Sequence, residues 1–227
     1  MQKLIGFLAA IVIGLSLSGC STVSPYSVRV NGYTAPGAPA PIKPGGFFCV
    51  VENKESKNPL LEAEVKGKIT KLLESRGYPV TSLDKADYCL LFAYGMGEPR
   101  SAGAAAPDYF GSVGWGVGGG YGWGGGWGGW GGPSVAIGIP WGGSATSATL
   151  YERWLLIKVV PASAYRTRQD APPVWVGEAR SVGPSSDLRM VLNYLLVADF
   201  KEFGKNTGQA VPMEIDAENP EVYSLTH

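Results

Sequence analysis

The chain has 227 residues, with 19 basic and 19 acidic side chains and one histidine, His227, at its last position. This charge balance gives no electrostatic reason to bind nucleic acid, so we expect no nucleic-acid partner. The lone histidine excludes a histidine-based catalytic triad and a zinc site with two or three histidine ligands, and we expect neither a metal nor a cofactor. The 33 glycines and 17 prolines are concentrated in two segments, which predicts one domain with long appendages.

Residues 1–19 have the features of a secretory signal peptide. Lys3 supplies a positive charge, an apolar or small-residue segment runs from Leu4 to Ser18, and the next charge is Arg29. The segment is short for a transmembrane helix; the alternatives are an uncleaved anchor or a buried core helix. The sequence LSGC, which ends at Cys20, resembles the lipobox of bacterial lipoproteins.

The lipobox resemblance implies that Cys20 is lipidated and becomes the first residue after cleavage. Several acyl chains of the palmitate type hold a protein on a bilayer effectively permanently. In Gram-negative bacteria an aspartate after the lipidated cysteine favours retention in the inner membrane, and this chain has Ser21. We therefore expect anchoring in the outer membrane, with the folded domain facing the periplasm.

The segment that follows the anchor, residues 20–46, is rich in proline, glycine and alanine. This composition predicts an extended tether. Folded structure is expected to begin at residues 47–52, an apolar run typical of a buried strand.

A helix is predicted from Asn58-Pro59 to Arg76, because asparagine is a good N-cap, proline suits the first helical position and Gly77 follows. Its apolar face consists of Leu61, Val65, Ile69 and Leu72. Residues 78–80 suggest a short strand, and residues 86–95 form a strongly apolar one. A strand, a helix and a second buried strand predict a right-handed βαβ unit with parallel pairing.

Residues 146–163 and 172–183 alternate like strands and predict an antiparallel hairpin joined by the polar loop 164–171. A second amphipathic helix is predicted from a cap at Ser186 to Gly204. The tail, residues 206–227, has no periodicity and is expected to be irregular. The predicted fold is therefore α/β (α+β), a mixed four- to five-stranded sheet with two helices on one face, over residues 47–205.

Several motifs occur in an order that resembles a family of small bacterial lipoproteins known as a domain of unknown function. They are Ser75-Arg76-Gly77-Tyr78, Ala86-Asp87-Tyr88 and Val174-Trp175-Val176-Gly177, followed by a closing helix. The resemblance spans residues 47–203 and implies the same fold and envelope location. Pro161-Ala162 departs from the family pattern, which often has an aspartate there. The family brings no established activity or catalytic residue.

Cys49 and Cys89 each lie in an apolar run. In an oxidising periplasm they form either a disulfide or two small buried apolar side chains. Trp154 and Trp175 lie in predicted strands, where aromatic side chains usually belong to the core. Polar residues of the hairpin are expected on its solvated face; these are Tyr151, Arg153 and Arg180.

The second glycine-rich segment, residues 99–145, interrupts the domain as an insert. Gly114, Gly116 and Gly119 have the spacing of a dinucleotide fingerprint, but no strand-turn-helix context surrounds them. Its candidate contact residues are Trp115, Tyr121, Trp123, Trp127, Trp130 and Trp141. A segment this rich in glycine cannot bury so many tryptophans, which predicts a partner: a bilayer interface, a glycan, or a protein. The alternative is a tolerated insertion that packs on its own domain.

These features predict an outer-membrane lipoprotein that is not an enzyme and acts as an envelope accessory or adaptor. The expected contact region is residues 111–143, with the membrane held through Cys20. The alternative function is a cell-wall- or lipid-directed hydrolase that uses carboxylates as acid and base, which requires two carboxylates facing each other across a cleft.

Overall fold

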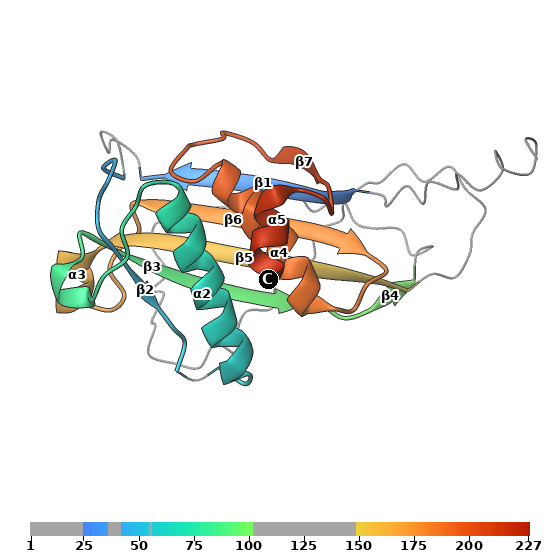
Figure 1. Cartoon of the computed structure of the whole chain (residues 1–227), viewed down its shortest axis with the longest axis horizontal. Coiled ribbons are helices and arrows are strands. Elements are labelled where there is room, and N and C mark those ends of the chain that lie inside the picture. The colour runs from blue at the N-terminus through green and yellow to red at the C-terminus, as the bar shows by residue number, and fades with distance from the viewer. Residues whose placement is uncertain (1–24, 36–41, 55, 102–148) are drawn as a thin grey trace, which may run out of the picture.

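The computed structural model describes residues 25–35, 42–54, 56–101 and 149–227. At its centre is a seven-stranded sheet in the order β2-β3-β5-β6-β1-β7, in which β4 also pairs with β5 (Figure 1). The strands are β1 (Tyr26–Thr34), β2 (Phe48–Val51), β3 (Tyr88–Met96), β4 (Arg100–Ser101), β5 (Thr149–Pro161), β6 (Trp175–Gly183) and β7 (Val211–Ile215). The described helices are α2 (Pro59–Ser75), α3 (Ala162–Thr167), α4 (Leu188–Lys201) and α5 (Pro220–Thr226), with a short 3-10 turn at Leu83–Lys85.

Strand pairing follows the predicted pattern at the centre of the sheet. β2 pairs with β3 in parallel, and helix α2 connects the two strands along the chain, as the βαβ prediction requires. β5 pairs with β6 in the antiparallel sense, as predicted for the hairpin. The mixed α/β class is therefore confirmed, although the sheet has more strands than the four or five predicted.

Local sequence explains where the two long helices begin and end. The Asn58 side chain accepts a hydrogen bond from the Leu61 N–H at 3.1 Å, and Pro59 occupies the first turn of α2. Gly77 follows the helix with φ 79°, a conformation that glycine adopts without strain. In α4 the cap is Asp187, which accepts from the Met190 N–H at 3.0 Å, and the predicted cap, Ser186, is one residue early.

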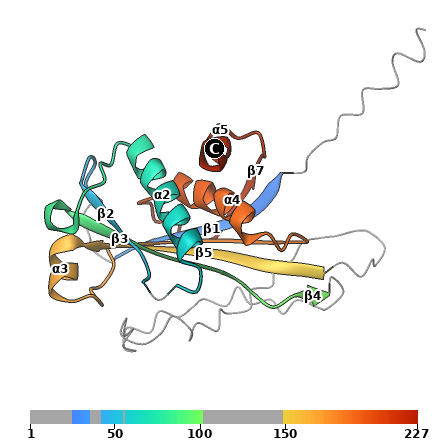
Figure 2. The same cartoon turned by 60° about the horizontal axis from the view of Figure 1, so that its bottom comes forward.

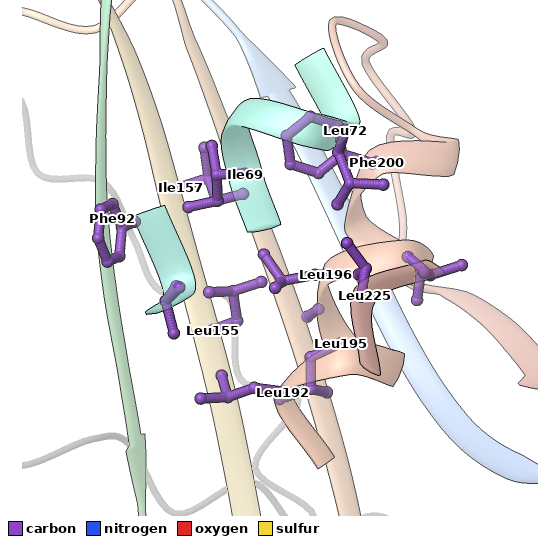
Figure 3. Packing of buried hydrophobic residues seen from close by; sticks show 14 of the residues in the cluster. Ile69, Leu72, Phe92, Leu155, Ile157, Leu192, Leu195, Leu196, Phe200 and Leu225 are labelled. Carbon is purple, nitrogen blue, oxygen red and sulfur yellow. The ribbon is translucent and has the colours of Figure 1, made fainter. Parts of the chain in front are cut away.

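Helices α2, α4 and α5 lie over one face of the sheet (Figure 2). We call it the helix-covered face; its strand residues include Leu90, Phe92, Leu155, Ile157 and Ala179. Figure 3 shows how the helices fill it: Ile69 and Leu72 come from α2, and Leu192, Leu195, Leu196 and Phe200 from α4. Most of these side chains are fully buried, so this layer is the main hydrophobic core.

The prediction of a tether over residues 20–46 is wrong for β1, which lies inside the sheet between β6 and β7. Val28 and Val30 are buried in the core, with exposed fractions of 1% and 0%. Every second residue from Tyr26 to Val30 is apolar, which is the alternation of a strand with one buried face. Asn31-Gly32 in its middle resembles a turn, and Gly32 is needed because a Cβ there would lie 2.5 Å from the Lys205 carbonyl oxygen.

The prediction of an irregular tail over residues 206–227 is also wrong. β7 forms the edge of the sheet beside β1, and α5 packs against α4. The Asn219 side chain accepts from the Glu221 N–H at 2.9 Å, and Pro220 opens α5. Val222 and Leu225 are buried, so the tail completes the core.

Two smaller differences concern connections. Residues 78–80 do not form a strand of their own; Val80 makes one parallel bridge to Phe48. The segment predicted as a polar loop, 164–171, begins with most of α3. Among the helices of the described residues, none is long and apolar enough to cross a bilayer.

Candidate functional site

The face of the sheet opposite the helices carries the polar side chains of the central strands, and we call it the second face. Strand register places Trp154 opposite Arg180, and Arg180 opposite Arg29. In the next row along the strands, Leu156 lies opposite Glu178. Of the described helices, α3 packs against this face, at the end that holds Cys89 and Val160.

Arg180 is the centre of an ion-pair cluster on the second face. Its Nη1 lies 3.0 Å from a carboxylate oxygen of Glu152, and its Nε donates to a carboxylate oxygen of Glu178 at 2.6 Å. The three side chains are only 12–19% exposed, so water screens these pairs less than it screens pairs at an open surface. The cluster fixes a planar guanidinium at the centre of the face.

Trp154 lies flat against the second face beside this cluster. A Cβ built on Gly95, its partner in β3, would lie 2.6–3.0 Å from three atoms of the indole. Glycine at position 95 therefore makes room for the ring on the sheet surface. The prediction that Trp154 belongs to the core is wrong, because it is half-buried on the second face, whereas Trp175 is fully buried as predicted.

The titratable groups of this face are held in ion pairs or affected by burial. Both carboxylates contact the same guanidinium, an arrangement that holds them as ion-pair partners. Burial lowers the pKa of Lys158, two residues beyond Leu156 on β5. Burial, followed by the charge of Glu178, raises the pKa of Tyr33 on β1. No group of three or more histidine, cysteine or carboxylate side chains suited to a metal occurs within the described residues.

Arg153 does not lie on the solvated face as predicted. It is paired with Ser181, one position out of phase with Arg180, so it points to the helix-covered side and is 1% exposed. Its Nη1 donates to the carbonyl oxygens of Tyr151, Gly183 and Ser185 at 2.8–3.3 Å. Burial lowers the pKa of this guanidinium. Arg153 therefore joins β5 to the loop that leads into α4.

Cys49 and Cys89 are direct partners in the parallel pair β2 and β3, with Cα atoms 4.7 Å apart. Their sulfur atoms are joined in a disulfide. Both residues are also buried, in the small apolar cluster beneath α3. The bond links the edge strand β2 covalently to the sheet.

Asp199 is a buried carboxyl that the sequence interpretation missed. It lies on α4 with no exposed surface, and neither oxygen has a hydrogen-bond partner among the described residues. Burial, followed by the negative charge of Glu178, raises its pKa well above the usual range. A Cβ at Gly177 would lie 2.5 and 2.6 Å from its two oxygens, so glycine there leaves room for the carboxyl group.

Sequence patterns indicate part of the Arg180 cluster and the unusual position of Asp199. Glu178 and Arg180 are two residues apart on a strand, a spacing that places both side chains on one face. Asp199 interrupts the apolar run Leu195–Phe200 of a helix, which is an unusual place for an acid. The predicted lipidation residue Cys20 and the predicted contact residues of the insert, from Trp115 to Trp141, lie outside the described residues.

The family model described as "Domain of unknown function (DUF4136)" matches residues 25–203. Since the match covers most of the chain, the protein belongs to this family, in agreement with the resemblance seen in the sequence. The match begins next to β1, which supports the revised start of the domain. No curated protein matches this chain.

Two solved structures illustrate how distant the structural similarities are. A PelC dodecamer from Paraburkholderia phytofirmans has 11% sequence identity and a TM-score of 0.39; the match covers 79% of this chain and 99% of that chain. A PDZ domain protein from Parabacteroides distasonis has 15% identity and a TM-score of 0.42, covering 90% of this chain and 42% of that chain. Similarity at this level carries no argument about function.

Proposed function

We propose that this member of the family is an outer-membrane lipoprotein of the periplasm, anchored through acyl chains on Cys20. In this proposal the α/β domain is not an enzyme. It acts as an envelope accessory or adaptor that displays the tryptophan-rich insert to a partner.

The observation that carries the proposal is the pairing of the two ends of the insert. Ser101 in β4 is the strand partner of Thr149 in β5, and Arg100 is the partner of Leu150. Residues 102–148 therefore leave and rejoin the sheet at neighbouring positions. An insertion closed in this way costs little chain entropy and leaves the domain's own strands in register. This supports a domain that presents the segment without depending on it.

The position of β1 supports the anchor. Pro25, the residue before β1, follows Cys20 by five residues. A fully extended chain spans at most about 3.6 Å per residue, so Cys20 lies within about 18 Å of Pro25. A lipid on Cys20 therefore holds the domain close to a bilayer surface.

The hydrolase alternative gains no support from the described face. Glu152 and Glu178 lie near each other on the second face, and both contact Arg180. A hydrolase of this class needs one carboxylic acid that keeps a proton and one free carboxylate. Glu152 and Glu178 are instead both held as ion-pair partners of one arginine.

Membrane fractionation tests the anchor directly. The wild-type chain is expected in the outer-membrane fraction. The Cys20→Ala variant is expected to keep its fold and to appear in the soluble periplasmic fraction. Ser21→Asp serves as the matched variant, because it is expected to remain membrane-bound but to move to the inner membrane. If Cys20→Ala still sediments with membranes, the anchor is refuted.

Crosslinking in intact cells tests the adaptor role. A photoreactive residue at Trp123 or Trp127 is expected to capture an envelope protein, glycan or lipid that the same probe at exposed Gln169 does not capture. Mass spectrometry then identifies the class of partner. Identical products from all three positions would contradict a role for the insert in binding.

A further inference from the structure

Arg153 carries a buried positive charge that has no acidic partner among the described residues. Its side chain is 1% exposed and contacts the loop that leads into α4. None of the ion pairs within the described part of the chain includes Arg153. Removing a charge from water costs free energy unless an opposite charge or hydrogen bonds compensate it, so this guanidinium calls for an explanation.

Hydrogen bonds hold this guanidinium through one of its three nitrogen atoms. All the hydrogen bonds that Arg153 makes to described residues come from Nη1, which donates to carbonyl oxygens of β5 and of the segment before α4. The buried Nε has no hydrogen-bond partner among these residues. Nε and Nη2 form the edge through which an arginine binds a carboxylate or phosphate group with two parallel hydrogen bonds. The backbone therefore fixes the guanidinium and leaves its bidentate edge without an acceptor from the described residues.

A second buried polar group lies beside Arg153. Ser181 in β6 is the strand partner of Arg153 in β5, so both side chains point to the helix-covered side. Residues directly opposite each other in an antiparallel pair have Cβ atoms about 4.5–5.5 Å apart, which makes these side chains neighbours. Ser181 is 1% exposed, and its Oγ also has no hydrogen-bond partner in the described structure. The sheet thus places two buried donors, the Nε–H and the hydroxyl, next to each other.

A glycine covers the guanidinium from the end of the sheet. Gly183 lies two residues beyond Ser181 on the same side of β6 and is half-buried. A Cβ at this position would lie 3.2 Å from Nη2 and 3.3 Å from Nη1 of Arg153. Figure 1 shows that the end of β6 and the start of β5 lie at the same end of the sheet. The guanidinium is therefore approached past a residue that has no side chain.

The surroundings of Arg153 favour a negative ligand. α4 begins at Leu188, three residues after Ser185, whose carbonyl oxygen accepts from Nη1 at 3.3 Å. The N-terminus of a helix carries a partial positive charge that favours anions. The cap residue Asp187 is exposed, so water screens its charge. Burial lowers the pKa of the Arg153 guanidinium, as expected for a charge removed from water, and an anion here would offset that cost.

We propose that Arg153 and Ser181 form a binding site for a small oxyanion, which is a carboxylate or a phosphate group. Nε–H and Nη2–H of Arg153 donate to two oxygens of the anion, and the Ser181 hydroxyl donates to one of them. The site lies on the helix-covered side, so it is separate from the Arg180 cluster. It goes beyond the proposed function, because it requires neither the lipid anchor nor the insert.

An anion titration of the full chain in a neutral detergent tests the site. The Nε–H resonance of Arg153 is followed by nuclear magnetic resonance while sodium acetate, sodium phosphate or sodium chloride is added at constant ionic strength. We expect acetate or phosphate to shift this resonance in a saturable way, and chloride to leave it nearly unchanged. Saturation by acetate identifies a carboxylate site, and saturation by phosphate identifies a phosphate site.

Three variants show whether the named residues form the site. Ser181→Ala is expected to weaken binding about tenfold, because it removes a hydrogen bond to a charged group. Gly183→Ala is also expected to weaken binding, since its Cβ would lie against the guanidinium. The matched control is Ser163→Ala, an exposed serine on α3, which is expected to bind like the wild type. Circular dichroism checks that each variant is folded.

Two results would overturn the proposal. If neither acetate nor phosphate shifts the resonance, or if chloride shifts it equally, Arg153 has no specific anion and water satisfies its free edge. If Ser181→Ala binds as tightly as the wild type, the hydroxyl takes no part and the site is not the one proposed. Arg153→Gln is expected to lose binding, and if this variant does not fold, the Ser181→Ala and Gly183→Ala titrations decide.

Discussion

Trp175 and Trp154 lie on opposite faces of the same sheet and have different surroundings. Trp175 is fully buried on the helix-covered face, its ring centroid 4.9 Å from that of Phe203, and its indole N–H donates to the Lys205 carbonyl oxygen at 2.9 Å. Trp154 lies flat over Gly95 on the second face, beside the ion pairs of Arg180. The helix-covered face is thus stabilised by burial, whereas the second face carries charged and aromatic groups that the core does not require.

The largest expected effect is the loss of Trp175. We expect Trp175→Ala to lower the free energy of unfolding by about 3–5 kcal/mol, because it opens a cavity in a close-packed core and leaves a carbonyl without its donor. Trp154→Ala is the matched variant and is expected to cost about 1–2 kcal/mol, since its ring is only half-buried. Urea titration followed by far-ultraviolet circular dichroism measures both. Equal losses would contradict the distinction between the two faces.

The elements that could be predicted from sequence are those whose apolar periodicity is long and uninterrupted. The 17-residue helix α2 has a cap, a proline at its start and a regular apolar stripe, and these three features together predict the helix and its bounds. β3 and β5 are long apolar strands, and their neighbours follow from hairpin and βαβ rules. Trp175 lies in one of these predicted strands, where an aromatic side chain is expected in the core, and it is fully buried.

The elements that were missed lie in segments rich in turn residues. β1 contains Asn31-Gly32, and β7 contains Pro212, which an edge strand tolerates because its N–H need not pair. Asn219-Pro220 has the same cap-and-proline start as Asn58-Pro59, but a seven-residue helix has too few turns to show a stripe. These elements form because the sheet and α4 provide a surface to cover, which local sequence does not reveal.

The candidate site was less predictable than the fold. Whether Arg153 or Arg180 lies on the solvated side depends on strand register, and a shift of one residue exchanges the faces. The pairing of Cys49 with Cys89 likewise follows from the register of β2 and β3.

The disulfide of the second face gives the next largest expected effect. It closes a loop with a sequence separation of 40 residues, and the double variant Cys49→Ala/Cys89→Ala is expected to lose about 2–4 kcal/mol, mainly through a less restricted unfolded chain. Unfolding with and without a reductant measures it. Reduction is expected to destabilise the wild type and to leave the double variant unchanged. A wild type that is insensitive to full reduction would show that burial alone holds β2 in place.

Asp199 is a buried carboxyl in the mostly apolar layer over the helix-covered face, and it makes stability depend on pH. Its pKa is raised in the folded state, so the folded protein retains a proton that the unfolded chain releases above about pH 4. The contribution of Asp199 to stability is therefore greatest below that pH and is lost as pH rises through the folded pKa. We expect Asp199→Asn to be more stable than the wild type at pH 7, by about 1–3 kcal/mol, and similar near pH 4.

Thermal unfolding at a series of pH values measures the effect of Asp199. The exposed Asp84→Asn serves as the control and is expected to keep the slope of the wild type between pH 4 and pH 7. If Asp199→Asn retains that slope, another group causes it, and the buried carboxyl is not the weak point of the core.

The smallest expected effect concerns the insert. Because Ser101 and Thr149 are already strand partners, replacing residues 102–148 with the two-residue turn Asn-Gly is expected to join β4 and β5 as a hairpin. We expect a change in unfolding free energy of less than about 1 kcal/mol, since longer loops add little closure entropy. Chemical denaturation measures it, with the Trp175→Ala loss as the reference for true core damage. A loss as large as that of Trp175→Ala would mean that the insert packs on the domain, most simply on the second face, and would replace the adaptor role with a structural one.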